Sequence, residues 1–103
     1  DLARWVAGEI EKSADFELLA PVPFSLVCFR YKPLEIDKSD ELNSINERLL
    51  QKLNASGLVY LTHTKLNGKY TLRMVIAQTN TEARHVEKAW ELIRTMAASV
   101  NEE

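Results

Sequence analysis

Two runs of β-prone residues flank Asn67-Gly68, within residues 57–77. An Asn-Gly pair between such runs favours a two-residue hairpin turn, because its type I′ form needs a positive φ at both central residues. The turn fixes which residues of the two strands, 58–66 and 69–77, lie opposite each other. The expected pairs are Leu66 with Lys69, Thr64 with Thr71, His63 with Leu72, Thr62 with Arg73, Leu61 with Met74, Tyr60 with Val75, and Val59 with Ile76. Because side chains alternate along a strand, one face is apolar, and the other is mostly polar and carries Arg73.

The rest of the pattern predicts three helices and two more strands. Apolar residues at helical spacing predict helices at 2–13, at 39–56 and along the C-terminal stretch. Alternation predicts a short strand at 15–19, and an apolar run predicts a strand at 24–32. Three sets of residues are typical of helix ends. They are Ser39 as an N-cap, Gly57 as a left-handed residue after the second helix, and Thr79 with Glu82 as a capping box.

This order of elements predicts an α+β fold of the split β-α-β type. We expect a four-stranded antiparallel or mixed sheet, with two helices on one face and an additional N-terminal helix. The strand 69–77 is expected between 24–32 and 58–66, with 15–19 at the edge beside 24–32. The strand 24–32 is apolar at both parities, which is typical of a strand covered on both faces. A domain of this size seldom covers both faces itself, so part of the cover is expected from elsewhere.

Composition narrows the class of protein. The chain has 103 residues, enough for one domain with a single core. A net charge of −2 without a basic block favours neither nucleic acid nor a membrane surface as a partner, and no apolar run could span a bilayer. With Cys28 alone, no disulfide can form within the chain, and a reducing, cytoplasmic setting is expected. The sequence starts without Met inside a helical pattern, which indicates a piece of a longer protein.

Few residues suggest chemistry. Cys28, His63 and His85 lack the spacing of metal ligands, so we expect no metal site. We expect a half-buried His63 on the apolar hairpin face and a solvent-exposed His85. The glycines are isolated and form no phosphate-binding loop, and no nucleophile with a paired base can be recognised. Nothing in the sequence gives Glu17 or Glu35 a catalytic role.

Arg73 is the most informative polar residue. It lies in mid-strand between Leu72 and Met74, opposite Thr62. In one interpretation its long side chain only lies over a polar surface, with its charged end in water. In the other, a guanidinium on a rigid strand binds a carboxylate through two parallel hydrogen bonds. The expected cover over this face favours the second interpretation.

Four motifs point to one family. They are SLVCFR, N-x-R-L-L followed by L-N-x-S-G, THT with G-x-Y-x-L-R, and T-x-x-x-H-V-x-x-A-W. Together they resemble the C-terminal small domain of the pyridoxal-phosphate-dependent group II decarboxylases, above all those acting on aromatic amino acids, tyrosine and tryptophan. The resemblance covers nearly the whole chain. Leu72-Arg73-Met74 matches the family's L-R-F stretch, whose arginine lies near the cofactor and the substrate carboxylate, with Met74 in place of Phe.

The resemblance implies a fold-type-I carboxy-lyase that is a homodimer and binds pyridoxal 5′-phosphate and an amino-acid substrate. Residues 1–14 would be a helix linking to a large catalytic domain, and residues 15–103 the small domain that packs on it and helps close the active site. Arg73 and Thr62 are the candidate substrate-binding residues. The family's cofactor lysine follows a histidine, and no lysine here does so, so this chain alone would hold no cofactor and be inactive. The alternative is a free-standing split β-α-β module that binds a small molecule or a partner.

Overall fold

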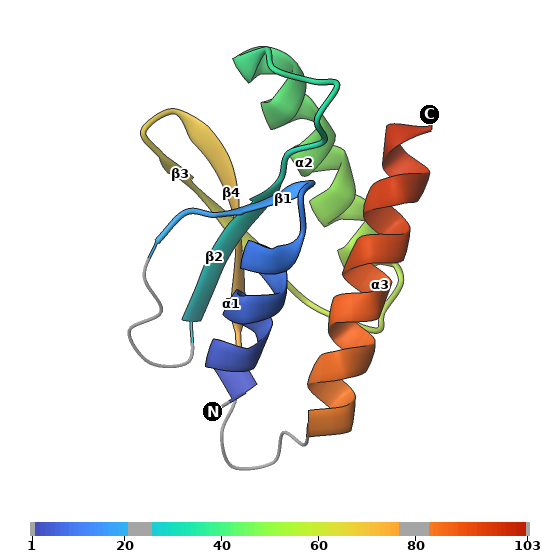
Figure 1. The fold of residues 1–103 in the computed structure, drawn as a ribbon. Coiled ribbons are helices and arrows are strands. Elements are labelled where there is room, and N and C mark those ends of the chain that lie inside the picture. Colours follow the sequence, from blue (N-terminus) through green and yellow to red (C-terminus); the bar gives the residue numbers. More distant parts are fainter. Residues whose placement is uncertain (1, 21–25, 77–82, 103) are drawn as a thin grey trace.

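The computed structural model describes residues 2–20, 26–76 and 83–102. They form three helices and four strands, which follow one another along the chain (Figure 1). In chain order these are α1 (Leu2–Lys12), β1 (Phe16–Leu18), β2 (Leu26–Tyr31), α2 (Ser39–Ala55), β3 (Thr62–Leu66), β4 (Lys69–Val75) and α3 (Ala83–Asn101). The number, type and order of the predicted elements are therefore confirmed.

The four strands form one sheet in the order β1-β2-β4-β3, and all three pairings are antiparallel. β4 lies between β2 and β3, the strands on either side of α2 in the sequence, which confirms the α+β split β-α-β prediction. The Asn-Gly turn has the expected left-handed conformation, with φ of 52° at Asn67 and 79° at Gly68. The predicted register of β3 and β4 is confirmed from Leu66–Lys69 to Thr62–Arg73.

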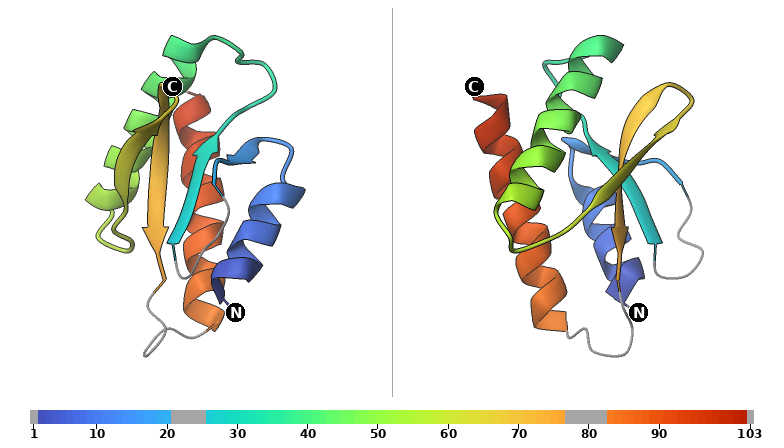
Figure 2. Two further views of the ribbon diagram at one scale, coloured as in Figure 1. Left: turned by 90° about the vertical axis from the view of Figure 1, so that its left-hand side faces the viewer. Right: turned by 180° about the vertical axis from the view of Figure 1, so that it is seen from behind.

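All three helices pack on the same face of the sheet. In Figure 2 (left) the strands β2 and β4 lie in front of α2 and α3. Val27, Phe29 and Leu72 project from this face into the core, where they are almost completely buried. The ring of Phe16 on β1 lies edge-on to that of Trp90 on α3, with 5.0 Å between the ring centroids. Within the described ranges, the opposite face of the sheet carries no helix, and we call it the outer face.

Three asparagines of α2 bind the backbone of neighbouring extended segments, and each uses its whole carboxamide. Asn46, which is fully buried, accepts from the Tyr31 N–H (2.7 Å) and donates to the Tyr31 carbonyl (2.8 Å). Asn43 accepts from the Tyr70 N–H (2.8 Å) and donates to the Gly68 carbonyl (3.0 Å). Asn54 accepts from the Leu61 N–H (2.8 Å) and donates to the Leu61 carbonyl (2.9 Å). α2 is thus attached to β2, to the hairpin and to the segment before β3.

Two of these asparagines end the ladder between β2 and β4. The last paired residues of that ladder are Phe29 and Leu72. In an antiparallel ladder every second pair exchanges hydrogen bonds, and the next such pair would be Tyr31 with Tyr70. The N–H and the carbonyl of Tyr31 are instead bound by Asn46, and the N–H of Tyr70 is bound by Asn43. The two strands separate at this point, where α2 supplies hydrogen bonds to both of them.

The structure corrects two predictions and leaves one outside its description. The expected strand 58–66 begins only at Thr62, because Asn54 binds both backbone groups of Leu61 and holds the preceding segment to α2. Ser39 is not the N-cap of α2: Lys38 occupies that position in an extended conformation, without a side-chain cap hydrogen bond. Gly57 does adopt the left-handed conformation, with φ of 75°. The capping box of Thr79 and Glu82 lies outside the described residues.

Replacement of Asn46 by leucine tests the role of the buried amide. The Asn46→Leu change keeps the branched shape of the side chain but leaves two Tyr31 backbone groups and the Leu42 carbonyl without this partner. Each unsatisfied buried polar group costs about 1–3 kcal/mol, so the free energy of unfolding should fall by at least ~2 kcal/mol in urea titrations. Gln51→Leu, at an exposed position of the same helix, is the control and should change it by less than about 0.5 kcal/mol. Equal values for the two variants would contradict this role.

Candidate functional site

Arg73 lies on the outer face, between neutral neighbours. Its strand position puts it opposite Cys28 of β2 on one side and Thr62 of β3 on the other. Its side chain is half-buried, and the structure gives it no hydrogen bond or ion pair with any residue in the described ranges. The predicted position of Arg73 and its pairing with Thr62 are therefore confirmed.

A second arginine lies close by on the same face. Arg30 is two residues along β2 from Cys28, so its side chain points to the outer face as that of Arg73 does. Only 5% of its surface is exposed, and its Nε donates to Glu17 Oε1 on β1 at 2.7 Å. A buried charge that loses its partner destabilises a fold by about 3–5 kcal/mol, so this pair is needed if Arg30 is to stay charged here.

The charges around Glu17 lower its pKa. Partial burial on its own raises the pKa of this carboxyl, but the hydrogen bond and the positive charge of Arg30 more than offset that effect. Lys69 and Lys32 lower the pKa further. Glu17 is therefore a carboxylate in the middle of three cations at one end of the outer face, and Arg73 lies toward the other end.

The outer face becomes apolar beyond Arg73. Val75, the next residue of β4 on this face, is 68% exposed and lies opposite the half-buried Leu26 of β2. Tyr60, just before β3, is 79% exposed. The expectation that both parities of β2 are buried is met in part: Val27 and Phe29 belong to the core, whereas Leu26 on the outer face remains partly accessible.

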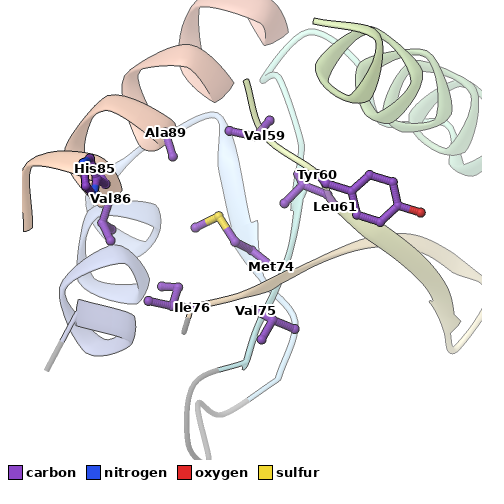
Figure 3. A pocket seen from close by; sticks show the side chains of 9 residues that line it. All are labelled: Val59, Tyr60, Leu61, Met74, Val75, Ile76, His85, Val86 and Ala89. Atoms are coloured by element: carbon purple, nitrogen blue, oxygen red, sulfur yellow. The ribbon is translucent and has the colours of Figure 1, made fainter. Parts of the chain in front are cut away.

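Sequence reasoning did not predict a pocket at one end of the sheet. It has a volume of about 230 Å³ and lies between the segment before β3, the end of β4 and the start of α3 (Figure 3). Met74 and Val59 point into it in the close-up, whereas the Tyr60 ring points away. Among the described residues that line the pocket, His85 carries the only imidazole ring. Such a lining suits packing against an apolar surface better than acid–base chemistry.

The two histidines and the cysteine are not grouped as the ligands of a metal ion would be. His63 is exposed rather than half-buried, because β3 is an edge strand, and its ring stacks on that of Tyr70 with 4.6 Å between centroids. His85 is exposed, as predicted. Cys28 is buried and not in a disulfide. Within the described ranges, no three His, Cys, Asp or Glu side chains are placed to hold a metal ion. None of the helices described is long and apolar enough to cross a membrane.

The lysines of this chain do not fit a pyridoxal phosphate site. A lysine that forms an imine is activated by a desolvated pocket or by a neighbouring cation. Lys52 is half-buried, and its Nζ bonds the Ser99 hydroxyl at 2.9 Å. Lys69 is half-buried beside the turn, and the other lysines are exposed. At the end of the outer face, Glu17 holds Arg30 in an ion pair, so that this guanidinium is not free for the phosphate of the cofactor.

Known proteins resemble the chain in both sequence and structure. No protein-family model matches it. It is 49% identical over 95 residues to tryptophan decarboxylase TDC2 of Camptotheca acuminata and 36% identical over 105 residues to a phenylacetaldehyde synthase of a Rosa hybrid cultivar. These alignments cover 90% and 96% of the chain but only 19% and 21% of the relatives. The crystal structure of Oryza sativa TDC with PLP and tryptamine superposes with a TM-score of 0.89 at 29% identity, over 95% of the chain and 21% of that protein.

The chain is homologous to the C-terminal region of plant aromatic amino-acid decarboxylases. The resemblance of its motifs to the group II decarboxylases is thereby confirmed, as is the fold of their small domain. It spans about a fifth of the length of the curated relatives that it matches.

The ion pair between Arg30 and Glu17 is the part of this face that sequence reasoning missed. Arg30 lies in the SLVCFR motif and Glu17 lies at an alternate position of a short predicted strand. Their pairing follows from the register of β1 and β2, in which Glu17 is opposite Arg30. The pair could have been predicted, because both residues occupy outward-facing positions of neighbouring strands and their charges are opposite.

The lowered pKa of Glu17 gives a prediction for acid titration. Because the pKa is lower in the folded chain than in the unfolded one, the stabilising effect of Glu17 is present at neutral pH and is lost as the pH falls through the folded-state pKa. Carboxyl NMR titration should give Glu17 a pKa below the ordinary value of a glutamate side chain. In Arg30→Met the pKa of Glu17 should rise, because its hydrogen-bonded cation is lost. An unchanged value in that variant would mean that Arg30 does not control Glu17.

Proposed function

We propose that this chain is the C-terminal small domain of a pyridoxal-phosphate-dependent aromatic amino-acid decarboxylase. In this proposal it packs on the large catalytic domain of the same protein, helps close the active site and belongs to a cytoplasmic homodimer. The observation that carries the proposal is a half-buried arginine that has no partner and no covering helix among the described residues, in a chain matching one fifth of such enzymes. A free-standing module would not account for that match.

The outer face has the composition of a surface that another domain covers. Val75 and Tyr60 expose most of their apolar surface beside the half-buried Leu26. Contiguous exposed apolar groups of this kind are typical of interaction sites. Covering them with a large domain would also remove water from around Arg73, which strengthens its attraction for an anion. The large domain is therefore placed on this face in the proposal, opposite the three helices.

Arg73 would hold the carboxylate of the amino-acid substrate. A guanidinium presents two parallel N–H donors to a carboxylate, and its strand position keeps those donors in a fixed place. Thr62, directly opposite Arg73, offers a hydroxyl that can donate to the same carboxylate or orient the guanidinium. Binding by Arg73 would set the direction of the bond between Cα and the carboxylate, which breaks in the reaction. The interaction would weaken as the carboxylate becomes neutral CO₂. When bound in the rest of the enzyme, pyridoxal phosphate takes up the electrons that this bond releases.

Replacement of Arg73 by lysine tests this role in the full-length protein. Lysine keeps the charge but loses the two parallel hydrogen bonds, so kcat/KM for the amino acid should fall by at least ~10-fold. Arg48→Lys, on the exposed side of α2, is the matched control and should leave kcat/KM unchanged. Both CO₂ and aldehyde should be quantified, since one relative is named a phenylacetaldehyde synthase.

The free energy of unfolding provides a second readout for the same variant. In this chain Arg73→Lys should change the free energy of unfolding by no more than about 0.5 kcal/mol, as is usual away from buried networks. Unaltered kinetics, or a chain that unfolds on this change, would instead assign Arg73 a purely structural role.

The isolated chain should neither bind pyridoxal phosphate covalently nor release CO₂. None of its lysines is buried, and none follows a histidine as the cofactor lysine of the family does. The measurement is mass spectrometry after treatment with pyridoxal phosphate and borohydride, with the full-length protein as the positive control. A stoichiometric adduct on one lysine of this chain, together with decarboxylation, would refute the proposed division of roles between the domains.

A further inference from the structure

The outer face carries two guanidinium groups on neighbouring strands. Arg73 pairs with Cys28, and Arg30 lies two residues further along β2 on the same face. Residues related in this way across an antiparallel pair are diagonal neighbours, with about 7–8 Å between their Cα atoms. Both side chains are within reach of an anion placed between them. Two adjacent cations would ordinarily form a site for a doubly charged anion such as a phosphate group.

The surroundings of the two arginines differ in charge. Arg30 is buried and has its carboxylate, Glu17 Oε1, at 2.7 Å. Arg73 is half-buried, and apart from Arg30 its neighbours on the outer face in β2 and β3 include the uncharged Cys28, Thr62 and Thr64. Glu17 thus compensates the guanidinium of Arg30, and Arg73 carries the guanidinium on this face for which the described residues supply no carboxylate.

We propose that Glu17 is a positioning residue, which makes Arg73 the single uncompensated guanidinium on the outer face and so fits this face to one carboxylate. The inference rests on the proposed function, in which Arg73 holds the substrate carboxylate. Its consequence for the reaction follows from charge. A carboxylate loses its negative charge as it becomes CO₂, so a second free cation nearby stabilises the bound substrate more than the transition state. Substrate would then bind more tightly and react more slowly.

Removal of the Glu17 charge tests the proposal in the full-length protein. Two ligands isolate the carboxylate: a 3-arylpropionate, which has the carboxylate without the amine, and the arylethylamine, which has the amine without the carboxylate. Their aryl group is that of the preferred substrate, and calorimetry gives their affinities. In Glu17→Gln the propionate should bind at least ~5-fold more tightly, because an uncompensated cation then acts on it at close range, whereas amine binding should stay unchanged. KM and kcat should both fall.

Three further variants separate charge from structure. Glu17→Gln combined with Arg30→Met removes both charges of the pair and should restore the affinity for the propionate. Thr64→Lys adds a cation on the other side of Arg73 at a half-buried position and should reproduce the effect of Glu17→Gln without touching the ion pair. It therefore keeps the test valid if Glu17→Gln does not accumulate as folded protein. Glu11→Gln, on the exposed side of α1, removes the same charge elsewhere and should do nothing.

The outcomes distinguish this inference from the proposed function. If Arg73→Lys weakens propionate binding but neither Glu17→Gln nor Thr64→Lys strengthens it, Arg73 binds the carboxylate and the positioning role of Glu17 is wrong. Equal changes in propionate and amine binding in the Glu17 variant would also overturn it, because a structural disturbance acts on both ligands. If Arg73→Lys itself leaves propionate binding unchanged, the proposed function of this face is wrong, and the inference about Glu17 is wrong with it.

Discussion

α2 holds the sheet through side-chain amides that take the place of strand-to-strand hydrogen bonds. Asn46 and Asn43 bind the backbone of Tyr31 and Tyr70, where the ladder between β2 and β4 would otherwise continue. Asn54 does the same for Leu61 before β3 begins. Each carboxamide matches one N–H and one C=O, so no buried polar group of these asparagines is left unsatisfied. The separation of the strands, the start of β3 and the position of the hairpin all depend on this helix.

The position of the hairpin determines what the outer face presents. With α2 attached to one side of the sheet, β4 is fixed with Leu72 toward the core and Arg73 toward the open side. The same alternation in β2 brings Arg30 out beside it, where Glu17 of the edge strand compensates its charge. Beyond Arg73 the face is apolar. A compensated pair, a cation without a partner among the described residues and an apolar margin therefore follow one another across a single surface.

Sequence reasoning worked where the determining interactions are local. The Asn67-Gly68 turn alone fixes the register of β3 and β4, so the pairing of Arg73 with Thr62 could be predicted without the fold. It failed where residues distant in the chain decide the outcome. The late start of β3 depends on Asn54, and nothing in the local pattern of residues 58–61 indicates that a helix binds the backbone of Leu61. The burial of Arg30 likewise depends on β1 and β2 coming into register. The exposure of His63 follows from its edge position, which periodicity does not reveal.

The account depends most on where the guanidinium of Arg73 lies when substrate is bound. A crystal structure of the full-length protein with a carboxylate-bearing substrate analogue would measure it directly. We expect two nitrogens of Arg73 at about 2.7–2.9 Å from the ligand carboxylate, as in charge-assisted bidentate pairs, with Arg30 still on Glu17 and the outer face covered by the large domain. An Arg73 side chain in bulk solvent, or one paired with a protein carboxylate away from the ligand, would contradict the account.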